Sequence, residues 1–173
     1  MPRLPALALA LALLSCPPAA GPARAGDPSS MEEKALPRVL IQRGERFLNL
    51  GKPAAAASCY AKVIARGEGT AEAAEAHNDL GVALTRLGRP EAALAEYEKA
   101  LAGGYPLARF NLGRALRRRC EETGDAADRA RARELLAGFG RWLDSGEPLP
   151  PVVEYNLPEL REYLDEAARA LEE

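Results

Sequence analysis

Hydrophobic residues recur along residues 37–143 at spacings of three and four, which is the periodicity of an amphipathic helix. Two Leu-Gly pairs, at 50–51 and 87–88, interrupt this pattern, and Pro53 and Pro90 follow them closely. Glycine favours the end of a helix, and proline favours the first helical turn. The pattern therefore predicts pairs of short antiparallel helices and an all-α fold.

The chain also repeats itself. Residues 50–57 recur as residues 87–94, at an offset of 37 residues. Further pairs share this offset: Gly44 and Gly81, Phe47 and Leu84, and Tyr60 and Tyr97. A hairpin of two amphipathic helices buries only one face by itself, so repeated hairpins must stack on one another. We expect an α-solenoid.

The best-defined unit has the pattern His77-x2-Leu80-Gly81-x2-Leu84, followed by Ala93-x3-Tyr97 and later by Pro106. This pattern resembles the tetratricopeptide repeat (TPR), although His77 and Leu84 stand at positions that are aromatic in the family motif. The resemblance implies hairpins at 37–73, 74–105 and, in degenerate form, 106–145. A TPR stack of this kind ends in a polar-faced cap.

The flanks of the repeats carry their own signals. Residues 26–36 predict a linker and a short N-terminal helix that Pro37 kinks or stops. In the third unit the first helix runs a turn longer, and Asp125 caps the next helix. Residues 146–156 predict a Pro-rich loop, and 157–173 predict a capping helix that begins at Asn156.

The N-terminal segment predicts export. Arg3 precedes an apolar run at 4–14, which is too short to span the ~30 Å core of a bilayer but fits a signal peptide ending at residue 25. As an alternative, Cys16 follows the run as in a bacterial lipoprotein signal of 1–15. The protein is then periplasmic or tethered to the outer membrane through a lipid on Cys16, its only predicted membrane contact.

Composition narrows the chemistry. With 23 basic and 25 acidic residues the chain has no excess positive charge for nucleic acid. Its single histidine, His77, excludes metal sites that need two, and it occupies a core position of the repeat. The sequence contains no G-x-G-x-x-G, Walker A or G-x-S-x-G motif. We therefore predict no enzyme activity, catalytic residue, cofactor, metal or small-molecule substrate.

Two cysteines remain after the signal segment. Cys59 and Cys120 fall in helical patterns of hairpins that are not adjacent. A disulfide requires Cα atoms within ~7 Å. We expect two unpaired, semi-buried thiols.

The TPR resemblance also implies a concave groove lined by the first helix of each hairpin. The predicted groove residues are Asn78, Val82, Thr85, Arg86, Phe110, Asn111, Arg114, Arg117 and Arg118, preceded in the first unit by Ile41, Glu45, Leu48 and Asn49. Because Arg forks suit carboxylates, the third-unit end predicts binding of an acidic peptide segment. The alternative is that residues 117–119 are a solvated helix end paired with Glu121 or Glu122.

Some TPRs bind chaperone peptides through a clamp of Lys, Asn and Arg. The counterparts here are Ile41, Glu45, Asp79, Leu107 and Asn111, which do not supply that set of side chains. The sequence thus predicts an exported adaptor or assembly factor that binds a different protein partner. A structural subunit of an envelope complex, with its groove permanently occupied, is the alternative.

Overall fold

The computed structural model describes the backbone of residues 28–172 and the side chains of 36–172. Helices account for most of this part of the chain, and its elements are α1 (Pro28–Asn49), α2 (Pro53–Ile64), α3 (Ala71–Arg86), α4 (Pro90–Ala102), α5 (Leu107–Thr123), α6 (Ala126–Leu143), α7 (Pro151–Tyr155) and α8 (Leu157–Ala170). The predicted signal segment and Cys16 lie outside the described residues.

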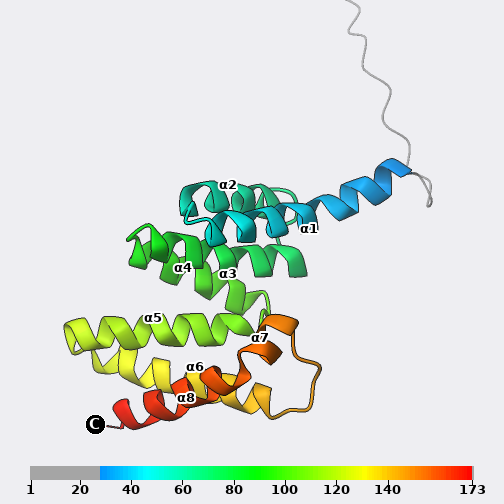
Figure 1. The fold of residues 1–173 in the computed structure, drawn as a ribbon. Helices are drawn as coiled ribbons and strands as arrows, with labels where there is room; N and C mark the ends of the chain where they lie inside the picture. Colours follow the sequence, from blue (N-terminus) through cyan, green and yellow to red (C-terminus); the bar gives the residue numbers. More distant parts are fainter. Residues whose placement is uncertain (1–27, 173) are drawn as a thin grey trace, which may run out of the picture.

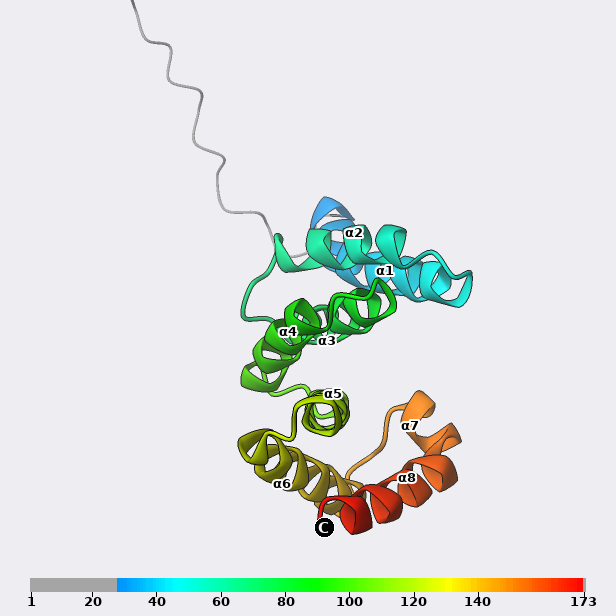
Figure 2. The ribbon, with the colours of Figure 1, turned by 90° about the vertical axis from the view of Figure 1, so that its left-hand side faces the viewer.

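Three antiparallel hairpins, α1–α2, α3–α4 and α5–α6, stack into a solenoid (Figure 1). Each hairpin contacts the next, and α8 packs against α6 at the end of the stack. Figure 2 shows that the stack curves, with α7 on its open side. The predicted all-α solenoid with a C-terminal capping helix is confirmed.

In each of the first two hairpins, a contact between a glycine and a tyrosine brings the two helices close together. A Cβ atom on Gly44 would lie 2.5 Å from the Tyr60 ring, and one on Gly81 would lie 2.5 Å from the Tyr97 ring. Both tyrosines are buried. The two helices of each hairpin can approach this closely only because glycine has no side chain.

The two Leu-Gly-x-Pro turns also share one geometry. Gly51 and Gly88 have φ values of 67° and 70°, in the left-handed region that favours glycine. After each glycine, the next backbone N–H bonds a carbonyl five residues back, from Lys52 to Phe47 at 2.8 Å and from Arg89 to Leu84 at 3.0 Å. This is the Schellman arrangement, which satisfies the last carbonyls of a helix.

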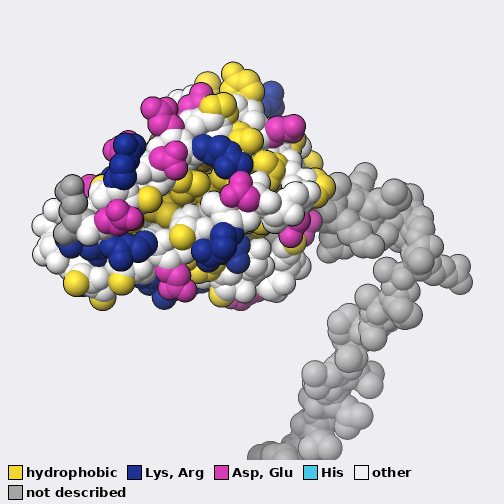
Figure 3. Space-filling model, turned by 90° about the horizontal axis from the view of Figure 1, so that it is seen from below, with side chains coloured by type: hydrophobic (Ala, Val, Ile, Leu, Met, Phe, Trp, Pro, Cys, Tyr) yellow, Lys and Arg dark blue, Asp and Glu magenta, His cyan; other side chains and the backbone are white. Residues whose placement is uncertain are grey.

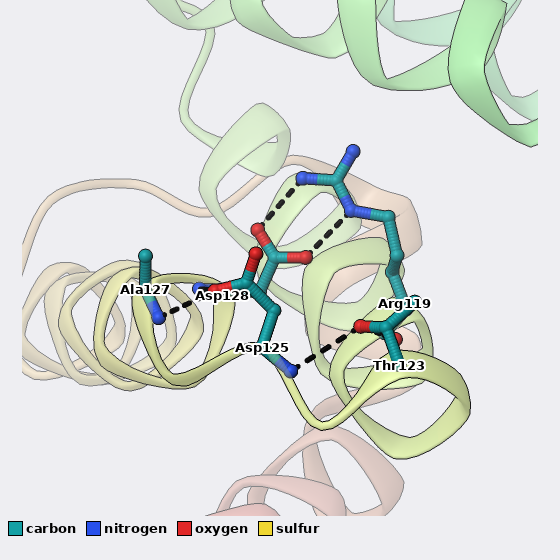
Figure 4. A network of polar contacts seen from close by, with 5 residues as sticks. All are labelled: Arg119, Thr123, Asp125, Ala127 and Asp128. Carbon is teal, nitrogen blue, oxygen red and sulfur yellow. Dashed lines mark hydrogen bonds and ion pairs between the residues drawn. The ribbon is translucent and has the colours of Figure 1, made fainter.

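The third hairpin departs from the other two as the sequence predicts. Its first helix extends to Thr123, and the Asp125 side chain accepts hydrogen bonds from the N–H groups of Ala127 and Asp128. Arg119 on α5 then holds the Asp128 carboxylate through two bonds of 2.6 and 2.7 Å (Figure 4). The displaced turn is therefore fixed by a helix cap and an ion pair.

The flanks differ from the predictions in three details. Of the two effects predicted for Pro37, the helix does not stop there: α1 runs through it, and the residues on either side of this proline, including Leu36 and Leu40, pack in the same core. The Pro-rich loop contains the short helix α7. Asn156 stands at the N-cap position of α8 as predicted, but its side chain donates to the Val152 carbonyl at 2.7 Å and makes no cap bond.

The C-terminal helix closes the stack. Ala167 and Leu171 are buried against the α5–α6 core, while acidic residues such as Glu159 and Glu166 face solvent. Figure 3 views this end and shows acidic and basic side chains interspersed among hydrophobic ones. Across the described residues, the model has no helix with both the length and the apolar composition needed to cross a membrane.

The two cysteines of the repeats are unpaired, as predicted. Cys59 on α2 and Cys120 on α5 are each 6% exposed, so they are more deeply buried than expected. Both act as small apolar residues of the core.

Candidate functional site

A groove of about 810 Å³ lies on the open side of the stack. The first helices of the hairpins form its wall, and α7 borders one end, as the arrangement in Figure 2 shows. Its lining residues are Arg38, Ile41, Gln42, Glu45, Leu48, Asn49, Tyr60, Glu75, Asn78, Asp79, Val82, Arg86, Tyr105, Leu107, Asn111, Pro150, Pro151 and Val152.

A short chain of hydrogen bonds crosses the middle of the groove. The Asn111 side-chain amide donates to the Asn78 side-chain oxygen at 2.9 Å, and Asn78 donates to Asp79 Oδ1 at 3.1 Å. Asn78 is only 3% exposed, whereas Asp79 and Asn111 are half-buried. The second and third hairpins are thus joined by side-chain amides that leave polar atoms facing the groove.

The Asp79 carboxyl lies in an environment that disfavours its charge. Burial, helped by the nearby negative charges of Glu75 and Glu45, raises its pKa to about 7 against the opposing effect of the hydrogen bond from Asn78. At neutral pH this carboxyl is therefore divided between its protonated and ionised forms.

The two arginines of the groove already have partners. Arg38 forms an ion pair with Glu75 at 2.6 Å, and Arg86 donates to the Leu48 carbonyl at 2.7 Å, at the end of α1. Among the residues whose side chains are described, no lysine or arginine lies within ion-pair distance of Glu45 or Asp79. These two carboxylates are the unneutralised charges of the groove.

The structure gathers only part of the predicted groove. Of the predicted residues, those that line it are Ile41, Glu45, Leu48, Asn49, Asn78, Val82, Arg86 and Asn111. Thr85, Arg114 and Arg118 instead line a hollow of about 70 Å³ that shares Asn111 with the groove. The groove therefore lacks the basic end that the sequence predicts.

Phe110 and Arg117 are engaged by the protein's own C-terminal helix. The Phe110 ring packs edge-on against Tyr163 with centroids 5.3 Å apart. Arg117 donates to the Tyr163 hydroxyl at 3.0 Å and forms an ion pair with Glu121 at 3.2 Å. Neither residue lines the groove of about 810 Å³, although Phe110 lines a hollow of about 170 Å³ that shares Asn111 and Val152 with it. An acidic partner segment in the groove therefore loses the support of Arg117.

Comparison with known proteins identifies the repeat. Residues 41–106 match the family model described as tetratricopeptide repeat. The chain therefore contains tetratricopeptide repeats over these residues. Among solved structures, its fold is similar to the first TPR of Spaghetti (RPAP3) bound to an HSP90 peptide, SRMEEVD. That similarity has a TM-score of 0.57 and 19% sequence identity, and it covers 80% of this chain and 94% of that chain. No curated protein matches the TPR protein.

The positions of the chaperone clamp do fall in the groove of this TPR protein. Ile41, Glu45, Asp79, Leu107 and Asn111 all line it. The repeat pattern thus assigned these five positions to the groove correctly. Two of them, Glu45 and Asp79, carry negative charge where the clamp would present positive or neutral donors. An acidic peptide of the clamp-binding kind would meet like charges here.

Sequence reasoning missed two groups of lining residues. The first comprises Tyr60 and Tyr105, which lie outside the first helices of the hairpins. The second is the segment from Pro150 to Val152, whose place against the groove depends on the path of a connection between α6 and α8. The sequence held one signal for Tyr60. Its counterpart Tyr97 has a hydroxyl partner in Thr85, and the residue that matches Thr85 in the first repeat is Leu48, which cannot form a hydrogen bond through its side chain.

His77 lies in the core, 7% exposed, with Nδ1 2.6 Å from a Glu96 carboxylate oxygen. Burial pushes the pKa of Glu96 upward, but hydrogen bonds from Lys99 and His77 outweigh this effect and lower it. The Lys99 ammonium lies 2.7 Å from the same carboxylate. This cluster links α3 to α4 and does not line the groove.

Proposed function

We propose that this TPR protein is a non-enzymatic interaction module that holds an extended segment or a helix of a partner protein in its groove. The observation that carries the proposal is the half-buried Asn111 amide, which lines a groove of about 810 Å³ and is held in place by its hydrogen bond to Asn78. Side-chain amides both donate and accept, so they suit the backbone of a bound peptide. The solved TPR structure with the similar fold contains a bound peptide.

We favour an adaptor or assembly factor over a structural subunit of an envelope complex with a permanently occupied groove, and the chain's own C-terminal helix does not fill the groove. The C-terminal helix covers Phe110 and Arg117, but it leaves the wall formed by α1 and α3 open. Val82 and Ile41 supply apolar surface on that wall. A partner that binds reversibly needs an open surface with apolar contacts.

Site-specific photo-crosslinking tests this function. A photoreactive residue at Val82, inside the groove, should give a discrete crosslink to one partner in cells. The same residue at Ala130, which is exposed on α6 outside the groove, serves as the control. Equal crosslinking at both positions, or none at Val82, would contradict binding in the groove.

We also propose that the protein acts outside the cytoplasm, on the basis of the signal-like segment 1–25. Fractionation followed by N-terminal sequencing of the mature protein tests this. A mature chain that begins at Gly26 supports ordinary cleavage, and one that begins with a lipidated Cys16 supports tethering. An intact Met1 on cytoplasmic protein would contradict export.

A further inference from the structure

The Tyr60 hydroxyl is a buried polar group without a partner. The residue is 0% exposed, and its oxygen makes no hydrogen bond within the described part of the chain. The equivalent Tyr97 hydroxyl lies 3.3 Å from the Thr85 hydroxyl, which Leu48 replaces in the first repeat. A buried hydroxyl left unpaired costs about 1–3 kcal/mol, so its retention at the groove needs an explanation.

Two carboxylates line the same groove as Tyr60. Burial raises the pKa of Tyr60 well above its usual range, and the charges of Asp79 and Glu45 raise it further. The three side chains come from three different helices, α2, α3 and α1, and all of them line the groove. The fold therefore brings an unpaired hydroxyl and two unneutralised carboxylates together on one wall.

The charges that face Asp79 are otherwise accounted for. Glu75, one turn earlier on α3, is neutralised by Arg38 of α1. Arg86 is seven residues further along α3, roughly 10 Å away along the helix axis, and is engaged by the Leu48 carbonyl. From the third hairpin the groove receives only the uncharged Leu107 and Asn111, and from α7 and its approach only Pro150, Pro151 and Val152; Tyr105 adds a neutral phenol.

We propose that the groove anchors a lysine or arginine side chain of the partner segment, with Asp79 and Glu45 as its counter-ions in front of the buried Tyr60 hydroxyl. This deepens the proposed function and rests on it. Such a cation would neutralise the two free carboxylates. The apolar end of the groove, at Leu107 and Val152, would hold the neighbouring part of the segment.

Asp79 carries a stability cost that supports a role in binding. A half-buried carboxylate with no cation beside it weakens the fold whenever it is ionised. Asparagine at this position would keep the hydrogen bond from Asn78 without that cost. A residue that breaks a local rule of stability in a groove is typical of a functional site.

A peptide selection tests the proposal. Random dodecapeptides displayed on phage are panned against the full chain at pH 8, and selected peptides are measured by fluorescence polarisation. The selected peptides should share a lysine or arginine, and replacing that residue by norleucine should weaken binding about tenfold or more. The variants Asp79→Asn and Glu45→Gln should each weaken binding by a similar factor.

Matched variants separate this effect from a general loss of charge. Glu68→Gln and Asp165→Asn remove exposed carboxylates outside the groove and should leave affinity unchanged. Glu45 is exposed, so Glu45→Lys should fold normally, reject the cationic peptides and select peptides with an acidic residue instead.

Failure of the inference and failure of the proposed function give different results. Peptides that lose affinity on Asn111→Ala but share no cationic residue and ignore Asp79→Asn would overturn the inference and leave groove binding intact. If no peptide binds, or binding is insensitive to every groove variant, groove binding itself is contradicted, and the inference falls with it.

Discussion

Arg119 and Asp128 form a two-pronged ion pair between the helices of the third hairpin, with N–H···O distances of 2.6 and 2.7 Å. Asp128 is 7% exposed and Arg119 is half-buried. The hydrogen bonds and the charge of Arg119 outweigh burial and hold the pKa of the Asp128 carboxyl below its usual range. This pair secures the turn where the third hairpin departs from the TPR pattern.

Breaking that pair should destabilise the fold in a pH-dependent way. Asp128→Asn should lower the free energy of unfolding by about 1 kcal/mol at pH 7, a modest figure because Arg119 is partly solvated. The folded-state pKa is depressed, so the contribution is present above the unfolded pKa of about 4 and is lost as the pH falls through the folded value. Urea unfolding at pH 7 and at about pH 3 measures this; an equal effect at both would contradict it.

The contact between Gly81 and Tyr97 predicts a severe effect from a single methyl group. Gly81→Ala would place Cβ 2.5 Å from the ring and should cost about 1–3 kcal/mol of stability. Gly138→Ala on α6 is the control, because its Cβ would meet its nearest neighbour at 3.5 Å, an ordinary contact. Thermal unfolding should show a lower Tm for the first variant only.

Asp79→Asn should stabilise the protein at neutral and alkaline pH. The folded-state pKa of about 7 exceeds the unfolded value of about 4, so the folded state binds more protons between these values and loses stability as the pH rises. The variant should therefore gain about 1–2 kcal/mol at pH 8 and nothing at about pH 4. A destabilised variant at pH 8 would show that Asp79 has a structural partner.

The affinity of the groove for a lysine-containing peptide should follow the same titration in the opposite sense. Only the ionised Asp79 carboxyl attracts a cation, so binding should strengthen about tenfold between about pH 6 and pH 8. In Asp79→Asn most of this dependence should disappear. A profile that is flat in the parent protein would argue against Asp79 as a counter-ion.

Tyr60→Phe and Tyr97→Phe should differ in stability although they occupy equivalent positions. The first removes an unpaired hydroxyl and should be neutral or stabilising by up to about 1 kcal/mol. The second removes a contact with Thr85 and should be destabilising. Chemical denaturation of the two variants side by side tests this, and the reverse order would mean that Tyr60 has a bound partner in the isolated protein.

Periodic features of the sequence predicted the fold well, because the same physical constraint recurs in each repeat. The offset that pairs Gly44 with Gly81 also pairs the tyrosines that pack on them, so each close approach was visible twice. The cap at Asp125 was predictable from local hydrogen bonding. The helix end considered at Pro37 did not appear, since the cost of proline inside a helix was outweighed by core packing on both sides of it.

The groove was harder to predict because its content depends on tertiary contacts with no periodic signature. Arg117 has the helical position of a residue that faces a partner, but its side chain forms a hydrogen bond with Tyr163, 46 residues later in the chain. Asp79 appeared only as a clamp position of the wrong charge, and its raised pKa arises from burial that the sequence does not display. The path of residues 150–152 across the end of the groove could not be inferred from composition.

The packing of α8 on the last hairpin sets a limit on the size of the recognition surface. Ala167 and Leu171 occupy the apolar face on which a further hairpin would have to stack. Neither an additional repeat nor a second copy of the chain can extend the solenoid from this end without displacing α8. The chain's own last helix therefore fixes the C-terminal boundary of the recognition surface.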